Sequence, residues 1–303
     1  MPNDTSRGIA LAAIGALVLT PDTLLMRLSG LSGAGMLGWR GLAMGTVLLA
    51  VWVVTARDRR GDLARLVCGA GAAVICAQAF NQVLFSGSIA VAPVPVVLFG
   101  LATVPVVSAL LSAVVLNERT GRATWVAIAA VLTGIGIAVL GENGGTVGLD
   151  PSALLGAAGG LAVAVVLSVS FVTLRRHPEL PMLPAIGTGA ILAGLSGSAV
   201  AGPAGLTAGS VWAILLAGAV VLPISFGLLS TASRHTRAAN VSLLMLTETV
   251  LGPVWVWLGT PEEPSAAVIL GGAIVVVSLA VYLLHERRGR RRQRPGGDLP
   301  GHG

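Results

Sequence analysis

The chain has 303 residues, of which 54% are hydrophobic and only 11% are charged. A water-soluble domain carries about a quarter of charged residues, so this composition excludes a soluble globular protein and predicts a chain solvated mainly by lipid. The net charge of +6 comes from arginine, because the sequence contains no lysine. A phosphate-binding P-loop requires a lysine, so ATP-driven transport by this chain alone is excluded as well.

Ten apolar runs follow one another along the chain, separated by short polar connections. Each run is long enough to cross the hydrocarbon core of a membrane, which takes about 20 residues of helix. The first run lacks a small-residue cleavage motif and is followed by further spans, so it is predicted to be a membrane helix and not a cleaved signal peptide. The predicted fold class is therefore an all-α integral membrane protein with ten transmembrane helices, at residues 8–27, 33–55, 66–87, 93–116, 122–141, 152–174, 182–203, 208–230, 238–259 and 265–284.

The arginines lie in every second connection between the spans and in the C-terminal tail, apart from Arg27 and Arg40. Cytoplasmic loops carry the excess of arginine, which predicts a multi-pass protein of the plasma membrane with both termini in the cytoplasm. The tail, residues 287–303, is predicted to be disordered and to lie against anionic lipid. No aromatic residue stands between its arginines to stack on bases, so nucleic acid is not an expected partner.

The two halves of the chain resemble each other. A shift of 144 residues aligns the segment from Val104 with the segment from Glu248 without a gap, and both read as a span, a turn that contains glutamate and a second span. The predicted units are residues 1–144 and 145–286, with five spans each. Because five is an odd number, the second unit must enter the membrane inverted relative to the first. Inverted repeats of this kind are typical of secondary transporters, whose substrate path lies at the repeat interface.

Two motifs at corresponding positions of the halves carry a family resemblance: "LNERTG" after the fourth span and "TETVLGPVWVWLGTPEEPS" in the second half. With these motifs the chain resembles the EamA-type branch of the drug/metabolite transporter superfamily over roughly residues 8–285. The resemblance implies a ten-helix, inverted-repeat carrier that exports or exchanges small metabolites, amino acids or drugs. One position departs from the symmetry, because Pro105 of the first half faces Thr249, and Pro253 follows four residues later. We therefore expect the ninth span to break about one turn further along, at Pro253.

Four polar side chains of the first three spans are predicted to lie at similar depths. With a rise of about 1.5 Å per residue, Asp22 lies about 21 Å above the start of its span, and Arg40 lies about 10 Å below the outer surface. Asn81 falls at the same level and Gln78 lies one turn lower. These residues predict a polar layer that lines a substrate cavity, with a structural Asp22–Arg40 ion pair as the alternative. Arg27 lies at the outer interface, where its side chain is expected to reach the headgroups.

Glu248 lies about 15 Å into the ninth span, close to the middle of the membrane. A charge at this depth costs roughly 3 kcal/mol or more, and such residues line substrate or proton pathways. Glu248 is therefore predicted to bind the substrate or a proton. Trp255 follows two turns later on nearly the same face and is predicted to line the same cavity. Glu118, at a cytoplasmic helix end, is predicted to cap the fifth span.

Four prolines lie well inside predicted spans. Proline removes one backbone donor and clashes with the carbonyl four residues earlier, so it kinks a helix. Freed carbonyls at depth must line a cavity or meet a partner, and kinks in both halves would let two helix bundles rock around a central site. The predicted hinges are Pro21, Pro105, Pro223 and Pro253.

The sequence favours a secondary carrier that works by alternating access, with proton exchange through Glu248 or Asp22 as an option. The alternatives are a membrane enzyme acting on lipid headgroups and a channel or scaffold without carrier activity. An enzyme would need a clustered acid, base or nucleophile near an interface, whereas the four histidines lie in loops or the tail without metal-ligand spacing. We expect no catalytic residue, metal or cofactor. The expected partners are a small-molecule substrate and the lipid bilayer, and the glycine-rich faces leave a homodimer open.

Overall fold

A computed structural model describes residues 2–91, 97, 100–117, 120–142, 151–259 and 266–292. These residues form helices and contain no strand. Seven stretches are long and apolar enough to cross a membrane, which confirms the all-α membrane class: Thr5–Ser29, Gly33–Thr55, Gly69–Ser88, Leu155–Arg176, Met182–Thr207, Val211–His235 and Ala238–Gly259. The other three predicted spans coincide with shorter apolar helices, at Val104–Val115, Arg122–Ile137 and Ile269–Tyr282. Glu118 and the end of the tail, residues 293–303, lie outside the described residues.

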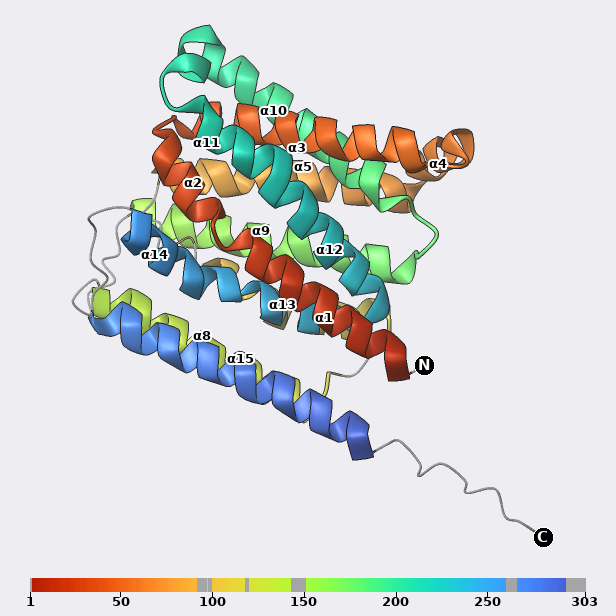
Figure 1. Ribbon diagram of the computed structural model, residues 1–303, viewed down its shortest axis with the longest axis vertical. Coiled ribbons are helices and arrows are strands. Elements are labelled where there is room, and N and C mark those ends of the chain that lie inside the picture. Colours follow the sequence, from red (N-terminus) through yellow and green to blue (C-terminus); the bar gives the residue numbers. More distant parts are fainter. Residues whose placement is uncertain are drawn as a thin grey trace.

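The helices lie side by side in one bundle (Figure 1). Helix α3 packs on α10 at one side of the bundle and α8 packs on α15 at the opposite side, while α5 packs on α9 and α1 on α12 between them. In chain order the elements are α1 (Pro2–Leu19), α2 (Asp22–Ser29), α3 (Gly33–Thr55), α4 (Arg59–Leu66), α5 (Gly69–Val91), α7 (Val104–Val115), α8 (Arg122–Glu142), α9 (Pro151–Arg176), α10 (Met182–Thr207), α11 (Val211–Leu216), the π-helical segment η1 (Ala217–Val221), α12 (Leu222–His235), α13 (Ala238–Met245), α14 (Thr247–Gly259) and α15 (Ala266–Arg292).

Glycines bring the backbones of α3 and α10 into direct contact. A Cβ atom added at Gly41 would lie 2.5 Å from the backbone nitrogen of Gly194, and one added at Gly197 would lie 2.6 Å from that of Gly38. Small residues at a helix interface allow this close approach, which drives helix association in membranes. At this pair of helices, glycine faces therefore pack within the chain. The tight pairing fixes the position of α3, whose residues Arg40 and Met44 reach the interior of the bundle.

The core is apolar and close-packed, and much of the outer surface is apolar as well. Phe171 and Leu229 are completely buried in the largest cluster of core side chains. On the outside, large apolar side chains such as Val54 and Val114 are more than four-fifths exposed. A soluble protein rarely presents extended apolar surface of this kind, so these side chains are placed to face lipid.

Two of the four predicted hinges lie next to breaks between helices. Helix α1 ends at Leu19 and α2 begins at Asp22, so the chain breaks at Thr20 and Pro21 as the sequence predicts. In the first half, a turn precedes α7, and Pro105 lies in the first turn of that helix. A proline is tolerated there because the amide hydrogen it lacks would have no partner within the helix.

The other two prolines behave differently. Pro223 follows the π-helical segment η1, in which the amide of Leu222 donates to the carbonyl of Ala217. A π-bulge accommodates a proline by local widening of the helix. Pro253 lies inside α14, which runs without interruption from Thr247 to Gly259. The expected break at Pro253 is therefore wrong.

The break in this span lies at Leu246, between α13 and α14. Thr249 stabilises this break, since its backbone amide and its hydroxyl both donate to the Leu246 carbonyl, at 3.1 and 2.7 Å. A threonine hydroxyl that bonds back to a carbonyl one turn earlier bends a helix. A threonine turn, and not the proline, therefore sets the position of this break.

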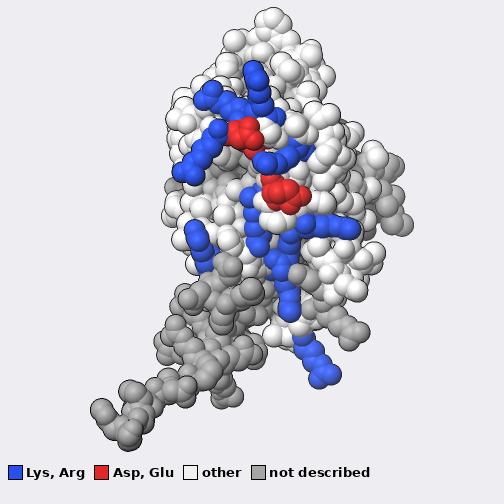
Figure 2. Space-filling model, turned by 90° about the vertical axis from the view of Figure 1, so that its right-hand side faces the viewer, with Lys and Arg blue, Asp and Glu red and all other residues white. Residues whose placement is uncertain are grey.

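Basic side chains gather on the end of the bundle where α1 begins and α4 lies (Figure 2). Some of them also tie helix ends together there. Arg175, in the last turn of α9, donates to the carbonyl of Thr236 at 2.8 Å, and Arg234 donates to the carbonyl of Leu180. The opposite end of the bundle carries Arg27, which is exposed in the last turn of α2, as expected for an interfacial anchor.

Candidate functional site

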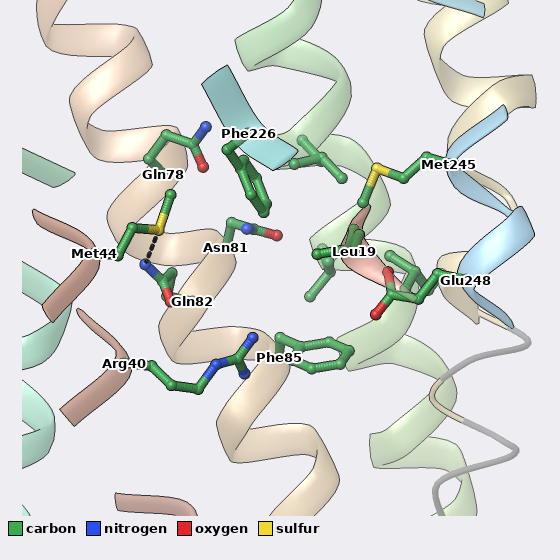
Figure 3. Close-up of a pocket in the computed structure, with 13 residues that line it drawn as sticks. Leu19, Arg40, Met44, Gln78, Asn81, Gln82, Phe85, Phe226, Met245 and Glu248 are labelled. Carbon is green, nitrogen blue, oxygen red and sulfur yellow. Dashed lines mark hydrogen bonds between the residues drawn. The ribbon is translucent and has the colours of Figure 1, made fainter. Parts of the chain in front are cut away.

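A small cavity of about 50 Å³ lies in the middle of the bundle. About 10–15 Å³ of such space holds one water molecule, so the cavity has room for a few waters. Four of the six residues predicted to bind substrate or proton line it, from three different helices. The complete lining is Leu19, Arg40, Met44, Gln78, Asn81, Gln82, Phe85, Leu101, Val163, Leu167, Phe226, Met245 and Glu248 (Figure 3).

Arg40 forms a buried ion pair with Asp22 at one wall of the cavity. Its Nη2 atom lies 2.6 Å from Oδ2 of Asp22, and the side chains are 7% and 3% exposed. The Nη1 atom of Arg40 contacts the sulfur of Met26 at 3.2 Å. Asp22 does not line the cavity itself, so its role here is to hold Arg40. The structural pairing that the sequence left open as an alternative is therefore present.

Three amide side chains project from one face of α5 toward the cavity. Gln78, Asn81 and Gln82 are spaced three and four residues apart, which places them on the same side of a helix. Gln78 makes a long contact of 3.5 Å with the hydroxyl of Ser170, and Gln82 contacts the sulfur of Met44 at 3.7 Å (Figure 3). Asn81 forms no hydrogen bond with the described residues, and its amide points into the space between Arg40 and Phe226. These amides are available to a ligand.

Glu248 faces Arg40 from the other side of the cavity (Figure 3). It lies in the first turn of α14, directly after the break at Leu246, where the positive end of the helix dipole favours a carboxylate. No described residue forms a hydrogen bond or an ion pair with it, although it lies within electrostatic reach of Asp22 and Arg40. A second cavity of about 10 Å³, enough for roughly one water, also borders Glu248. The carboxylate is thus accessible from within the bundle.

Trp255 lies outside the cavity lining. Its indole nitrogen donates to the hydroxyl of Thr20 at 2.8 Å, and the side chain is 40% exposed. It therefore connects α14 with the break between α1 and α2. Trp255 is the only one of the predicted binding residues that neither lines the cavity nor pairs with a residue that does.

Sequence reasoning missed Gln82 and the apolar part of the lining. Gln82 follows Gln78 by four residues on α5, so the same helical spacing that predicted Gln78 and Asn81 also indicates Gln82. The apolar lining residues, such as Phe226 and Met245, carry no comparable signal. In a chain that is 54% hydrophobic, nothing in the sequence distinguishes them from residues that face lipid.

The described residues contain no group of three or more histidine, cysteine, aspartate or glutamate side chains that could hold a metal ion. Within the part of the chain that the structure describes, the polar chemistry of the cavity therefore consists of one paired guanidinium, one carboxylate and three amides.

Comparison with known proteins identifies the family. The sequence profile of the EamA-like transporter family matches residues 6–140. A protein of Streptantibioticus cattleyicolor, described as a probable terminal-alkyne amino-acid exporter, is 31% identical over 312 residues, which cover 93% of this chain and 96% of the relative. The chain belongs to the EamA-like transporter family. It is a multi-pass membrane protein and a membrane transporter.

The fold of this EamA-like transporter also occurs among solved structures. One crystal structure superposes on it with a TM-score of 0.76 and 21% sequence identity, over 93% of this chain and 98% of the solved chain. The likeness extends along both halves of the sequence, whereas the family profile matches the first half.

Proposed function

We propose that this EamA-like transporter is a secondary carrier that exports an amino acid across the plasma membrane. The observation that carries the proposal is that Arg40 and Glu248 line one buried cavity from opposite sides. A guanidinium binds a carboxylate with two parallel hydrogen bonds, and a carboxylate binds an ammonium group. A zwitterionic amino acid presents both groups on the same carbon atom. The description of the Streptantibioticus cattleyicolor relative as an amino-acid exporter supports the same class of substrate.

The carrier has ten transmembrane helices in two inverted repeats, residues 1–144 and 145–286. Two features of the structure support this arrangement. Helices α8 and α15, which pack against each other, occupy corresponding positions at the end of each half of the chain. The turn before α7, at residues 102–103, and the break at Leu246 are related by the offset found in the sequence. Inverted repeats allow alternating access around a central site. The arginine-rich end of the bundle faces the cytoplasm, with both termini, as cytoplasmic loops are rich in arginine.

Export is coupled to protons by competition for Glu248. Among the described residues, Asp22 neutralises Arg40, and this leaves Glu248 as the uncompensated charge of the site. An uncompensated carboxylate at this depth costs roughly 3 kcal/mol or more. The ammonium group of a bound amino acid offsets this cost, and in the empty carrier a proton does so. Ammonium and proton therefore replace each other, so that an outgoing zwitterion is exchanged for an incoming proton.

The test is transport by the purified protein in proteoliposomes, with a panel of labelled amino acids and with and without a pH gradient. We expect saturable uptake that is accelerated by unlabelled amino acid on the opposite side of the membrane. A pH gradient should stimulate net transport by the wild-type protein but not by Glu248→Gln. The control is Glu179→Gln, which removes one negative charge from an exposed pair with His177 and should respond like the wild type.

Each contrary result has a defined meaning. Stimulation of Glu248→Gln equal to that of the wild type would exclude proton exchange through Glu248. A flux that rises linearly with concentration, without acceleration by substrate on the other side, would identify a channel. Absence of uptake for the whole amino-acid panel would overturn the assignment of the substrate class.

A further inference from the structure

The cavity has two chemically different parts. Arg40, Glu248 and the amide of Asn81 form a polar part. Phe226 and Met245 lie on one side of this polar level and face each other across the cavity, with the amide of Gln78 beside Phe226 (Figure 3). Met245 precedes Glu248 by three residues along α13 and α14, so it lies about one turn closer to the arginine-rich end of the bundle.

Val163 and Leu167 of α9 complete the apolar part. They are four residues apart and so lie on the same face of that helix. At most 1% of the surface of each side chain is exposed, and the same holds for the neighbouring core residues Phe171 and Leu229. Next to Leu167, the hydroxyls of Ser168 and Ser108 are hydrogen-bonded to each other at 2.9 Å. These two hydroxyls are thus paired with each other, and the space beyond the apolar part is filled.

We propose that Phe226, Met245, Val163 and Leu167 form a side-chain subsite that selects the transported amino acid by the polarity and size of its side chain. The inference rests on the proposed function, because it takes the α-ammonium and α-carboxylate groups to lie between Glu248 and Arg40. From that position, the side chain of the substrate enters the apolar part of the cavity. The class of substrate is an amino acid with a small, uncharged, apolar side chain.

Selection by polarity and selection by size have separate physical causes. An apolar side chain gains about 25 cal/mol for each Å² that it removes from water. A polar side chain of the same size gives up its hydrogen bonds to water, and the four residues of the subsite offer none in return; only the amide of Gln78, beside Phe226, could replace one of them. The apolar part of the cavity ends at a close-packed core, so a bulky side chain meets the wall. One methylene group in an apolar pocket changes discrimination by roughly tenfold or more.

The experiment measures competition for carrier-mediated exchange in proteoliposomes, with L-alanine, L-valine, L-leucine, L-phenylalanine and L-asparagine as competitors of a labelled substrate. L-leucine and L-asparagine have similar sizes, and we expect L-leucine to compete at least roughly tenfold better. Phe226→Ala widens the subsite and should shift the ratio of L-phenylalanine to L-alanine affinity upward by at least roughly tenfold. Val163→Phe fills the subsite and should shift this ratio in the opposite direction.

The matched control is Phe80→Ala, which removes the same atoms from a side chain of α5 that is 58% exposed and does not line the cavity. Its affinity ratio should equal that of the wild type. Each ratio is measured within one protein preparation, so a lower yield of folded variant does not change it, and Phe226→Leu replaces Phe226→Ala where the latter does not fold.

Two failures are distinguishable. A wild-type protein that exchanges no amino acid contradicts the proposed function. A wild-type protein that exchanges amino acids, but whose ratios do not change in either subsite variant, contradicts the side-chain subsite alone. Equal competition by L-asparagine and L-leucine would overturn its apolar character.

Discussion

Replacing Asp22 by asparagine isolates the contribution of one buried charge to the stability of the bundle. The carboxylate accepts a hydrogen bond of 2.6 Å from Arg40, and the two side chains are only 3% and 7% exposed. Asparagine keeps the size of the side chain and an acceptor oxygen but removes the negative charge. Arg40 then becomes a buried cation that has lost its ion-pair partner.

The size of the effect follows from this burial. Removal of one partner of a buried ion pair destabilises a protein by about 3–5 kcal/mol, because the remaining charge stays out of water. Asp22→Asn retains an acceptor oxygen for the guanidinium, which places the expected loss at the lower end, about 3 kcal/mol. For a chain of this order of size, each kcal/mol lowers the unfolding midpoint by about 2–4 °C. We therefore expect a decrease of roughly 6–12 °C.

The assay is thermal unfolding of the purified protein in detergent, followed by the fluorescence of its six tryptophans. Membrane proteins often unfold irreversibly, so midpoints are compared at one heating rate. The double variant Asp22→Asn with Arg40→Gln has no buried charge at this pair and should recover most of the loss. Glu179→Gln, which removes a charge from an exposed pair, should leave the midpoint unchanged, since exposed ion pairs contribute little.

Two results would refute the reasoning. If Asp22→Asn unfolded at the wild-type midpoint, the charge on Asp22 would not be needed to hold Arg40. If the double variant were as unstable as the sum of the two single variants, the two side chains would act independently, and the loss would come from some other contact of each residue.

The helix breaks and the helix contacts give two further predictions. Pro21→Ala removes the residue that separates α1 from α2 and should slow counterflow at least several-fold, whereas Pro253→Ala, inside the continuous helix α14, should change the rate by less than about twofold. Gly41→Leu places a side chain within 2.5 Å of backbone atoms and should abolish a monodisperse peak in size-exclusion chromatography. Gly227→Leu, at a glycine with no neighbouring atom within 4 Å of an added Cβ, should elute like the wild type, and similar profiles of the two leucine variants would contradict the packing argument.

The polar site was predictable from the sequence because depth along a membrane helix is a count of residues. A constant rise of about 1.5 Å per residue placed Arg40 and Asn81 at one level, and both line the cavity. Glu248 stood out because a charge near the middle of a span is expensive. Neither step required knowledge of which helices pack together.

The length of the site along the helix axis was not predictable in the same way. Trp255 follows Glu248 by seven residues, so it shares nearly the same face of α14 but lies about 10 Å further along the axis. This distance takes it beyond the cavity, to the hydroxyl of Thr20. The face of a helix is therefore encoded in the sequence, whereas the length over which that face borders the cavity depends on tertiary packing.

The positions of the breaks explain why the chain tolerates carboxylates at this depth. Thr20 and Thr249 each donate, through the backbone amide and the hydroxyl, to the carbonyl three residues earlier. Each turn lies where a new helix begins, and Asp22 and Glu248 fall in the first turns of α2 and α14. A helix N-terminus stabilises a carboxylate by about 0.3–1 kcal/mol, and by up to about 2 kcal/mol when partly buried, against an insertion cost of roughly 3 kcal/mol.

The turn before α7 has the same hydrogen bonds but no charged residue in the helix that follows. Thr103 donates in the same manner to the carbonyl of Gly100 before α7, but Pro105 and valines fill the first turn of that helix. The turn alone therefore does not require a carboxylate. At α14 the helix N-terminus offsets part of the cost of a lone Glu248, and the remaining cost, about 1 to 2.7 kcal/mol by these magnitudes, is small enough for an ammonium group or a proton to offset. Thr20 lies two residues before Asp22 and Thr249 lies one residue after Glu248. A threonine turn next to an acidic residue inside an apolar span is thus a more specific indicator of this site than a proline in the same span.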